Sequence, residues 1–368
     1  MKVTPFVYKD YKLNLVITDD EAARIHEKYA KLFNARRYSF VAMRWHPKRR
    51  RLFLGCTSTG GDILVEFDPA KGTFRSCGYA RSGLRGPTED KIHKGLWLDE
   101  EEDALYFGTA SLAPAPRTVG RPGGSLVRYR IAERKFERLA RPVVGSHIQA
   151  TIYDRARRMI YFYTLPALGF GVFDLRKRKL VRHDAMGSIP HIGCLDDAGG
   201  VWGTYGFSAQ AFFRYVPEED RYEFPTGCVF PCAVDGANVA YKGSGPVDSL
   251  LNGGDGWLYA GSTLGEFFRI EPRSGKVEHL GKPFPGKRLP AMCLADDGMI
   301  YLSGGQDKKT MLGRYDRATG SIEKLGPVAD RRGRACFRAH EIAVVDGTAY
   351  IGETDNQQRS GYLWACEV

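Results

Sequence analysis

The sequence predicts an all-β protein, a seven-bladed β-propeller with one N-terminal amphipathic helix. The chain has 368 residues, of which 43 are glycine and 12% are aromatic. That composition is typical of many short strands joined by turns. A short phrase recurs seven times, and each copy is followed by a further apolar strand. The spacing of roughly 40 to 55 residues matches a four-stranded blade.

The recurring phrase is an apolar residue, an aromatic residue, any residue and then glycine or a substitute. It follows a turn such as DDAGG or VDG and precedes a strand such as DILVEFDP or EFFRIEP. The seven copies are LFLGCTS (52–58), LYFGTAS (105–111), IYFYTLP (160–166), VWGTYGF (201–207), LYAGSTL (258–264), IYLSGGQ (300–306) and AYIGETD (349–355). We therefore expect seven blades over residues 39–368, within a single domain of residues 1–368.

Residues 1–38 are expected to hold a closing strand and a helix. The last repeat has no fourth strand before the sequence ends at Val368, and FVYKDYKLNLVI (6–17) could supply it. This pairing would protect an otherwise open sheet edge. The segment DDEAARIHEKYAKLFNARR (19–37) has helical periodicity, with acidic residues first and basic residues last. It predicts one amphipathic helix lying on the propeller.

The formal net charge of +11 predicts a diffuse positive field that attracts anionic ligands. No basic stripe interleaved with aromatic residues is present, which disfavours nucleic acid as a partner. The first twenty residues lack a continuous apolar stretch, and no segment is long enough to span a membrane. The sequence as written therefore predicts a cytoplasmic protein, although a secreted chain without its leader would look the same. Oligomeric state is not predicted.

Four of the eight histidines stand near the start of a predicted innermost strand. They are His93, His147, His191 and His340, each twelve to sixteen residues before the glycine position of its repeat. Innermost strands line the central channel of a propeller, so these histidines are expected at one mouth of it. Arg338 stands two residues before His340, and Arg44 and Asn252 are expected near the same end. A lone histidine at a strand start is usually structural, but four at one rim indicate a functional site.

Two longer phrases resemble a known family. DKIHKGLWLDEEEDALYFGT (90–109) and RACFRAHEIAVVDGTAYIGETDNQQRSGYLW (334–364) are similar to the seven-bladed propeller polysaccharide lyases, which include ulvan lyases and a rhamnose–glucuronate lyase acting on gum arabic. The resemblance implies β-elimination at a uronic acid of an acidic oligo- or polysaccharide, with no redox cofactor required. A base removes the C5 proton, donors neutralise the carboxylate, and an acid protonates the departing oxygen.

The resemblance implies that His93 is the first catalytic histidine. A second family histidine is expected about twenty residues later, where this chain has Ala110–Ala113. The family's tyrosine falls at Leu165, close to Tyr163, and a family arginine aligns with His191. The candidates for the missing catalytic roles are therefore Tyr163, His147 and His191. The candidates for binding the substrate are Arg338, His340, Arg44, Asn252 and Arg359.

Two other functions remain open at this point. Three neutral imidazoles with Glu341 or water could hold Mn, Fe or Zn at the channel mouth, and such a metal could neutralise the uronate directly. The GCVFPC segment (227–232) lacks the second cysteine pair of a zinc motif, so no metal is predicted there. Alternatively, the chain is a non-catalytic propeller that binds a sugar or a protein, since the fold alone does not determine function.

Overall fold

The structure is a computed structural model that describes residues 1–9, 38–58, 61–86, 89–112, 120–187, 192–206, 211–228, 247–305, 308–356 and 358–368. Over these residues the protein is all-β, and one 3-10 turn, Tyr79–Arg81, is its only helical element. The helix expected over 19–37 lies outside the described residues. The chain divides into two compact units. The 6–185 unit also includes 354–363, and the 186–353 unit also includes 1–5 and 364–368.

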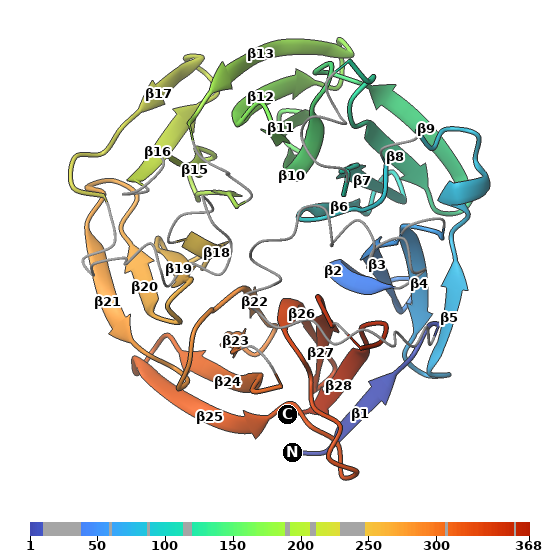
Figure 1. Cartoon of the computed structure of the whole chain (residues 1–368). Helices are drawn as coiled ribbons and strands as arrows, with labels where there is room; N and C mark the ends of the chain where they lie inside the picture. The colour runs from blue at the N-terminus through green and yellow to red at the C-terminus, as the bar shows by residue number, and fades with distance from the viewer. Residues whose placement is uncertain are drawn as a thin grey trace. The chain divides into compact units, whose positions relative to one another are not determined.

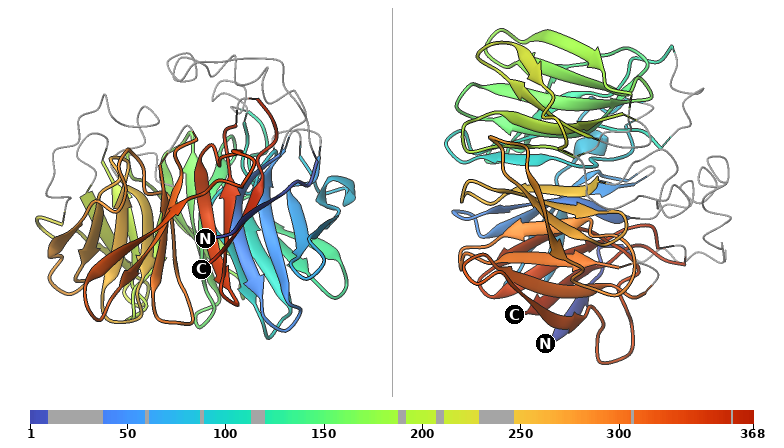
Figure 2. Two further views of the ribbon diagram at one scale, coloured as in Figure 1. Left: turned by 90° about the horizontal axis from the view of Figure 1, so that it is seen from below. Right: turned by 90° about the vertical axis from the view of Figure 1, so that its left-hand side faces the viewer.

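The 6–185 unit contains three antiparallel sheets of four strands, each in chain order (Figure 1). The first has β2 (Ser39–His46), β3 (Arg51–Thr57), β4 (Leu64–Asp68) and β5 (Thr73–Ser76). The second has β6 (Leu96–Asp99), β7 (Ala104–Gly108), β8 (Leu126–Arg130) and β9 (Lys135–Ala140). The third has β10 (His147–Asp154), β11 (Met159–Leu165), β12 (Gly169–Asp174) and β13 (Lys179–Ala185). Its strands run side by side in green in Figure 2.

The 186–353 unit contains three more sheets of the same kind and most of a fourth. The fourth sheet has β14 (Cys194–Leu195), β15 (Val201–Tyr205), β16 (Ala211–Val216) and β17 (Arg221–Glu223). The fifth has β18 (Val247–Asn252), β19 (Leu258–Ser262), β20 (Phe267–Ile270) and β21 (Val277–Gly281). The sixth has β22 (Ala291–Leu294), β23 (Ile300–Gly304), β24 (Met311–Asp316) and β25 (Ser321–Pro327). The last sheet has β26 (Ala339–Val345), β27 (Thr348–Glu353) and β28 (Leu363–Glu367).

The N-terminal strand β1 (Val3–Phe6) completes the last sheet, in the order β1-β28-β27-β26. An N-terminal closing strand was expected from 6–17, but β1 overlaps that segment only at Phe6. The sequence prediction was therefore right about the pairing and wrong about the residues. Each of the seven recurring phrases forms the second strand of its sheet, as the repeat predicts.

A β-bulge interrupts four of the first strands at the same point. The register shifts between Phe40 and Ala42, Ile148 and Ala150, Val247 and Ser249, and Ala339 and Glu341. The extra residues are Val41, Gln149, Asp248 and His340. Bulges re-aim side chains and break the alternation of a strand, so simple alternation cannot place residues at these strand starts.

Apolar side chains fill the space between neighbouring sheets of the 6–185 unit. One cluster joins the first two sheets through residues such as Phe53, Leu64 and Phe107. Another joins the second and third sheets through Tyr106, Ile148, Phe162 and their neighbours. Burial of these side chains stabilises the packing by roughly 1.5–3 kcal/mol for each large residue.

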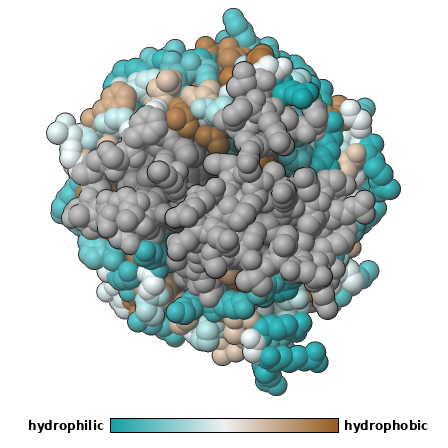
Figure 3. Space-filling model, viewed as in Figure 1, coloured by the Kyte–Doolittle hydropathy of each residue, from teal (hydrophilic) through white to brown (hydrophobic). Residues whose placement is uncertain are grey.

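The described residues on the face in Figure 3 are mostly hydrophilic, with apolar ones scattered between them.

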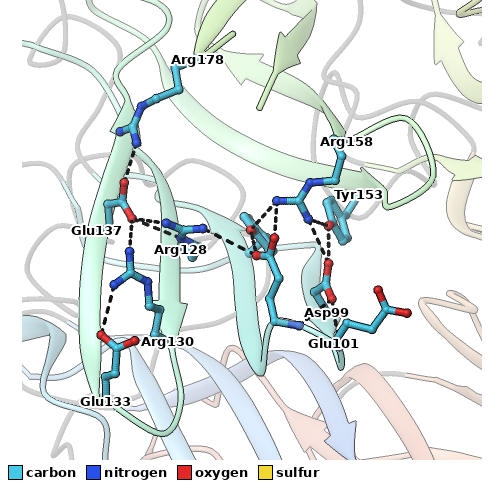
Figure 4. Close-up of polar contacts among 11 residues, drawn as sticks. Asp99, Glu101, Arg128, Arg130, Glu133, Glu137, Tyr153, Arg158 and Arg178 are labelled. Carbon is cyan, nitrogen blue, oxygen red and sulfur yellow. Dashed lines mark hydrogen bonds and ion pairs between the residues drawn. The ribbon is translucent and has the colours of Figure 1, made fainter. Parts of the chain in front are cut away.

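Ion pairs join the second and third sheets at their turns (Figure 4). Arg158, in the β10–β11 turn, lies 3.1 Å from Asp99 of β6, and Tyr153 donates to the same carboxylate at 2.6 Å. Arg178, in the β12–β13 turn, lies 2.6 Å from Glu137 of β9. Both arginines have positive φ, 58° and 51°, so the same tight turn aims each side chain at the preceding sheet.

Candidate functional site

The start of β10 carries the first candidate, His147. Its side chain is buried, with 5% of its surface exposed, and the backbone of His147 pairs with Leu165 of β11. His93 lies between the end of the first sheet and β6 and is half-buried. His340 is the second residue of β26, in the 186–353 unit, and His191 lies outside the described residues. Within the 6–185 unit, the structure brings His93 next to the segment that carries His147.

The bulges show that these histidines do not share one position. His340 is itself the bulged residue of β26, as Gln149 is of β10, whereas His147 stands two residues before the bulge. Arg338 stands two residues before its bulge and so corresponds to His147. The single column expected from counting back to the glycine position is therefore wrong.

The pairing of first and second strands also identifies Lys91, a residue that was not predicted from the sequence. Lys91 pairs with Ala110, two residues after Gly108, just as His147 pairs with Leu165, two residues after Tyr163. Lys91 and His147 thus occupy equivalent positions in adjacent sheets. Counting from the second strand, rather than searching for histidines, would have found it.

Backbone hydrogen bonds hold these two positions together. The Lys91 N–H donates to Ala110 at 3.0 Å, and the Ala110 N–H donates back at 2.8 Å. The neighbouring Thr109 carbonyl accepts from the Ile148 N–H at 3.0 Å. Gly124 allows the backbone to pass this close to Thr109, because a Cβ at Gly124 would lie 2.2 Å from the Thr109 carbonyl oxygen. The segment between β5 and β6 that carries Lys91 is consequently held by backbone hydrogen bonds against the residues that follow β7.

His93 has a defined proton position. Its Nδ1 lies 3.2 Å from the backbone carbonyl oxygen of Gln149. A carbonyl can only accept a hydrogen bond, so Nδ1 must carry the proton in this contact. In the neutral imidazole the lone pair is then on Nε2. His93 therefore has the tautomer of a general base that acts through Nε2.

His147 is held neutral. Burial, and after it the nearby Lys91 charge, lower the pKa of His147 to about 3, while Gln149 opposes the shift. Neither ring nitrogen of His147 has a hydrogen-bond partner, nor has the buried Oε1 of Gln149. The Gln149 amide is thus close to the imidazole without a well-aligned bond. Buried polar atoms without partners are costly and commonly mark a place for water or a ligand.

Lys91 is also withdrawn from water. Burial lowers the pKa of its ammonium to about 8, although Asp355 and Asp90 favour the charged form. The Lys91 ammonium forms no hydrogen bond or ion pair within the described part of the chain. Asp90 is itself held by the Leu112 N–H at 3.3 Å and by Arg85 at 3.6 Å. Burial raises the pKa of Asp90.

Other predicted residues have structural contacts. Tyr163 is fully buried in β11, its ring 5.4 Å from that of Phe170. Arg44 donates to the Leu96 carbonyl at 3.0 Å and lies over the Trp97 ring.

Arg44 and Asn252 also differ from their expected location. Arg44 is the sixth of eight residues in β2, and Asn252 is the last residue of β18, where it donates to Asp197 at 3.0 Å. Both lie toward the ends of their strands, away from the strand starts that carry His147 and the bulges.

Two predicted binding residues lie on other segments. Arg359 stacks on the Tyr362 ring at 3.5 Å and donates to the Ser360 carbonyl at 2.8 Å. Arg338 is buried and lies over the Phe337 ring at 5.0 Å.

Among the described residues no three or more His, Cys, Asp or Glu side chains are grouped as metal ligands. The proposed histidine–metal arrangement includes His191, which is outside those residues, and stays a prediction. None of the helical structure in the described ranges is long and apolar enough to cross a membrane.

Comparison with solved structures places this architecture among known folds. A structure of streptogramin B lyase matches with a TM-score of 0.61 and 14% identity, over 98% of this chain and 97% of that one. A catalytically inactive variant of virginiamycin B lyase from Staphylococcus aureus with quinupristin matches with a TM-score of 0.61 and 15% identity, over 96% and 98%. The chain is a seven-bladed β-propeller. Scans against family models and curated protein sequences give no match.

Proposed function

We propose that this propeller is a lyase that performs β-elimination at a uronic acid of an acidic oligosaccharide. The observation that carries the proposal is the 3.2 Å contact between His93 Nδ1 and the Gln149 carbonyl oxygen, from which we infer that the lone pair of the neutral ring is on Nε2. Removal of the C5 proton needs such a base, positioned by a second group. The net charge of +11 supports an anionic substrate.

In the proposed reaction His93 Nε2 takes the C5 proton, its electron pair forms the C4–C5 double bond, the C4–O bond breaks, and the departing oxygen takes a proton from water. His147 and the Gln149 side chain contribute unfilled donor and acceptor sites beside it, suited to sugar hydroxyls. Arg338, His191 and His340 stay the candidates that the sequence gives for neutralising the uronate. The two similar structures are of lyases, which supports elimination chemistry, while the acidic sugar comes from the sequence resemblance.

A second function, non-catalytic binding of an acidic sugar, is favoured by one observation. The segment that pairs with Lys91 begins Ala110-Ser111-Leu112 and supplies no acid–base side chain where the resembled family has its second histidine. In that case the unfilled polar atoms around His147 would bind a ligand without reacting.

The test is ultraviolet absorbance of the unsaturated uronate during incubation with a panel of uronate-containing oligosaccharides, with and without chelator. We expect a rising signal that is at least about 100-fold slower in His93→Gln, the usual scale for loss of a general base. A signal that chelator alone abolishes would indicate the metal-dependent reaction instead. A flat trace, with saturable binding of the same sugars, would establish the binding function.

A further inference from the structure

We propose that Lys91 is a nucleophilic amine that captures a small polar aldehyde as an imine, beside His147 and Gln149. This reaction is separate from the proposed elimination and does not depend on it.

The backbone of Lys91 is fixed on both sides. It bridges Thr57 at the end of β3 and Ala110 after β7, and the next residue, Ile92, donates to the Cys56 carbonyl at 3.1 Å. The side chain therefore starts from a rigid point between two sheets. A reactive group that must meet a ligand in one geometry is best carried by such a rigid element.

The amine has few competing contacts. Lys91 is half-buried, and its ammonium has no hydrogen bond or ion pair among the residues that the structure describes. By contrast, Lys2 and Lys276 on the surface are ion-paired at 2.6 and 2.7 Å. Burial favours the neutral amine, which is the nucleophilic form, although the charges of Asp355 and Asp90 oppose this shift.

The charged and titratable groups around the amine are suited to imine chemistry. Asp90 and Asp355 act on Lys91 from two segments, and Arg85 lies beside Asp90. The two carboxylates favour a positive iminium once it has formed. His147 remains neutral across the physiological range, so its ring has one nitrogen that can accept a proton and one that can donate.

The reaction balances without any further reagent. The Lys91 nitrogen attacks the aldehyde carbon, a C–N bond forms, and a proton moves from nitrogen to the carbonyl oxygen to give a carbinolamine. The C–O bond then breaks and water leaves, so that the imine forms. His147 is placed to carry the proton between nitrogen and oxygen. The unfilled Gln149 Oε1 would accept a hydrogen bond from a hydroxyl of the aldehyde.

The test is reductive trapping on the full chain. The protein is incubated with glyceraldehyde or glyoxylate and sodium cyanoborohydride at pH 7, and the alkylated lysines are located by mass spectrometry. Lys91 should be labelled at least about tenfold faster than the exposed Lys177 and Lys276, because an ordinary lysine amine is almost fully protonated at that pH. Equal or slower labelling of Lys91 in the folded protein would overturn the proposal.

Two variants distinguish the role of Lys91 from that of its neighbours. Lys94→Met, three residues away, should leave labelling of Lys91 unchanged, and His147→Leu should slow it while leaving the other lysines as they were. Preference for glyoxylate over glyceraldehyde would identify an anionic aldehyde, and the reverse a neutral one. Since labelling needs no elimination activity, a silent uronate assay would not affect this result.

Discussion

At the scale of single residues, the site is defined by two basic side chains held away from water. Burial keeps His147 neutral and brings the pKa of Lys91 down to about 8. Neither ring nitrogen of His147 has a hydrogen-bond partner among the described residues, so His147 weakens the fold relative to an apolar residue of similar shape. Stability given up in this way is typical of residues kept for binding or catalysis.

Protonation of His147 should make the protein sensitive to acid. In the unfolded chain His147 takes up a proton near its ordinary pKa of about 6.5, whereas in the folded protein it does so only near 3. The unfolded state therefore binds more protons between these values, and stability falls as the pH drops below 6.5. Denaturant titrations should show that wild type loses about 1 kcal/mol more than His147→Leu between pH 7.5 and 5.5. Parallel losses in both proteins would contradict this account.

At the scale of strands and turns, a bulge and a turn are each repeated. The bulge near the start of β2, β10, β18 and β26 places Gln149 and His340 at equivalent points. The positive-φ arginines Arg158 and Arg178 each reach from a turn of the third sheet to the second. The bulges set where functional side chains point, and the turns keep the two sheets of the site in contact.

Arg158 should matter more than its neighbour in the same turn. Arg158→Met leaves Asp99, which is 2% exposed, without its guanidinium partner, and we expect a loss of about 2 kcal/mol. Arg155 pairs with an exposed carboxylate, Glu101, so Arg155→Met should change stability little. Chemical denaturation of the two variants checks the difference, and equal effects would show that the pair with Asp99 does not hold the sheets.

At the scale of the whole molecule, the periodic features were predictable and the tertiary ones were not. The seven sheets could be predicted because each copy of the recurring phrase has its own apolar pattern and follows its own turn. The position of β1 was misjudged, since 3–6 and 6–17 are both strand-like and only pairing with β28 distinguishes them. Counting back from the second strand locates the position of Lys91, but the surroundings that lower its pKa are a property of the packed sheets and could not be predicted. The bulges likewise leave no clear signal in a strand's composition.

The central claim is that His93 is a base that presents Nε2, and its tautomer can be measured directly. Nitrogen-15 chemical shifts of the His93 ring, assigned by comparison with His93→Gln and recorded at a pH where the imidazole is neutral, distinguish the two forms. We predict a protonated Nδ1 and an unprotonated Nε2, because Nδ1 faces the Gln149 carbonyl. A proton on Nε2 instead would contradict the claim and leave His93 unable to act as the proposed base.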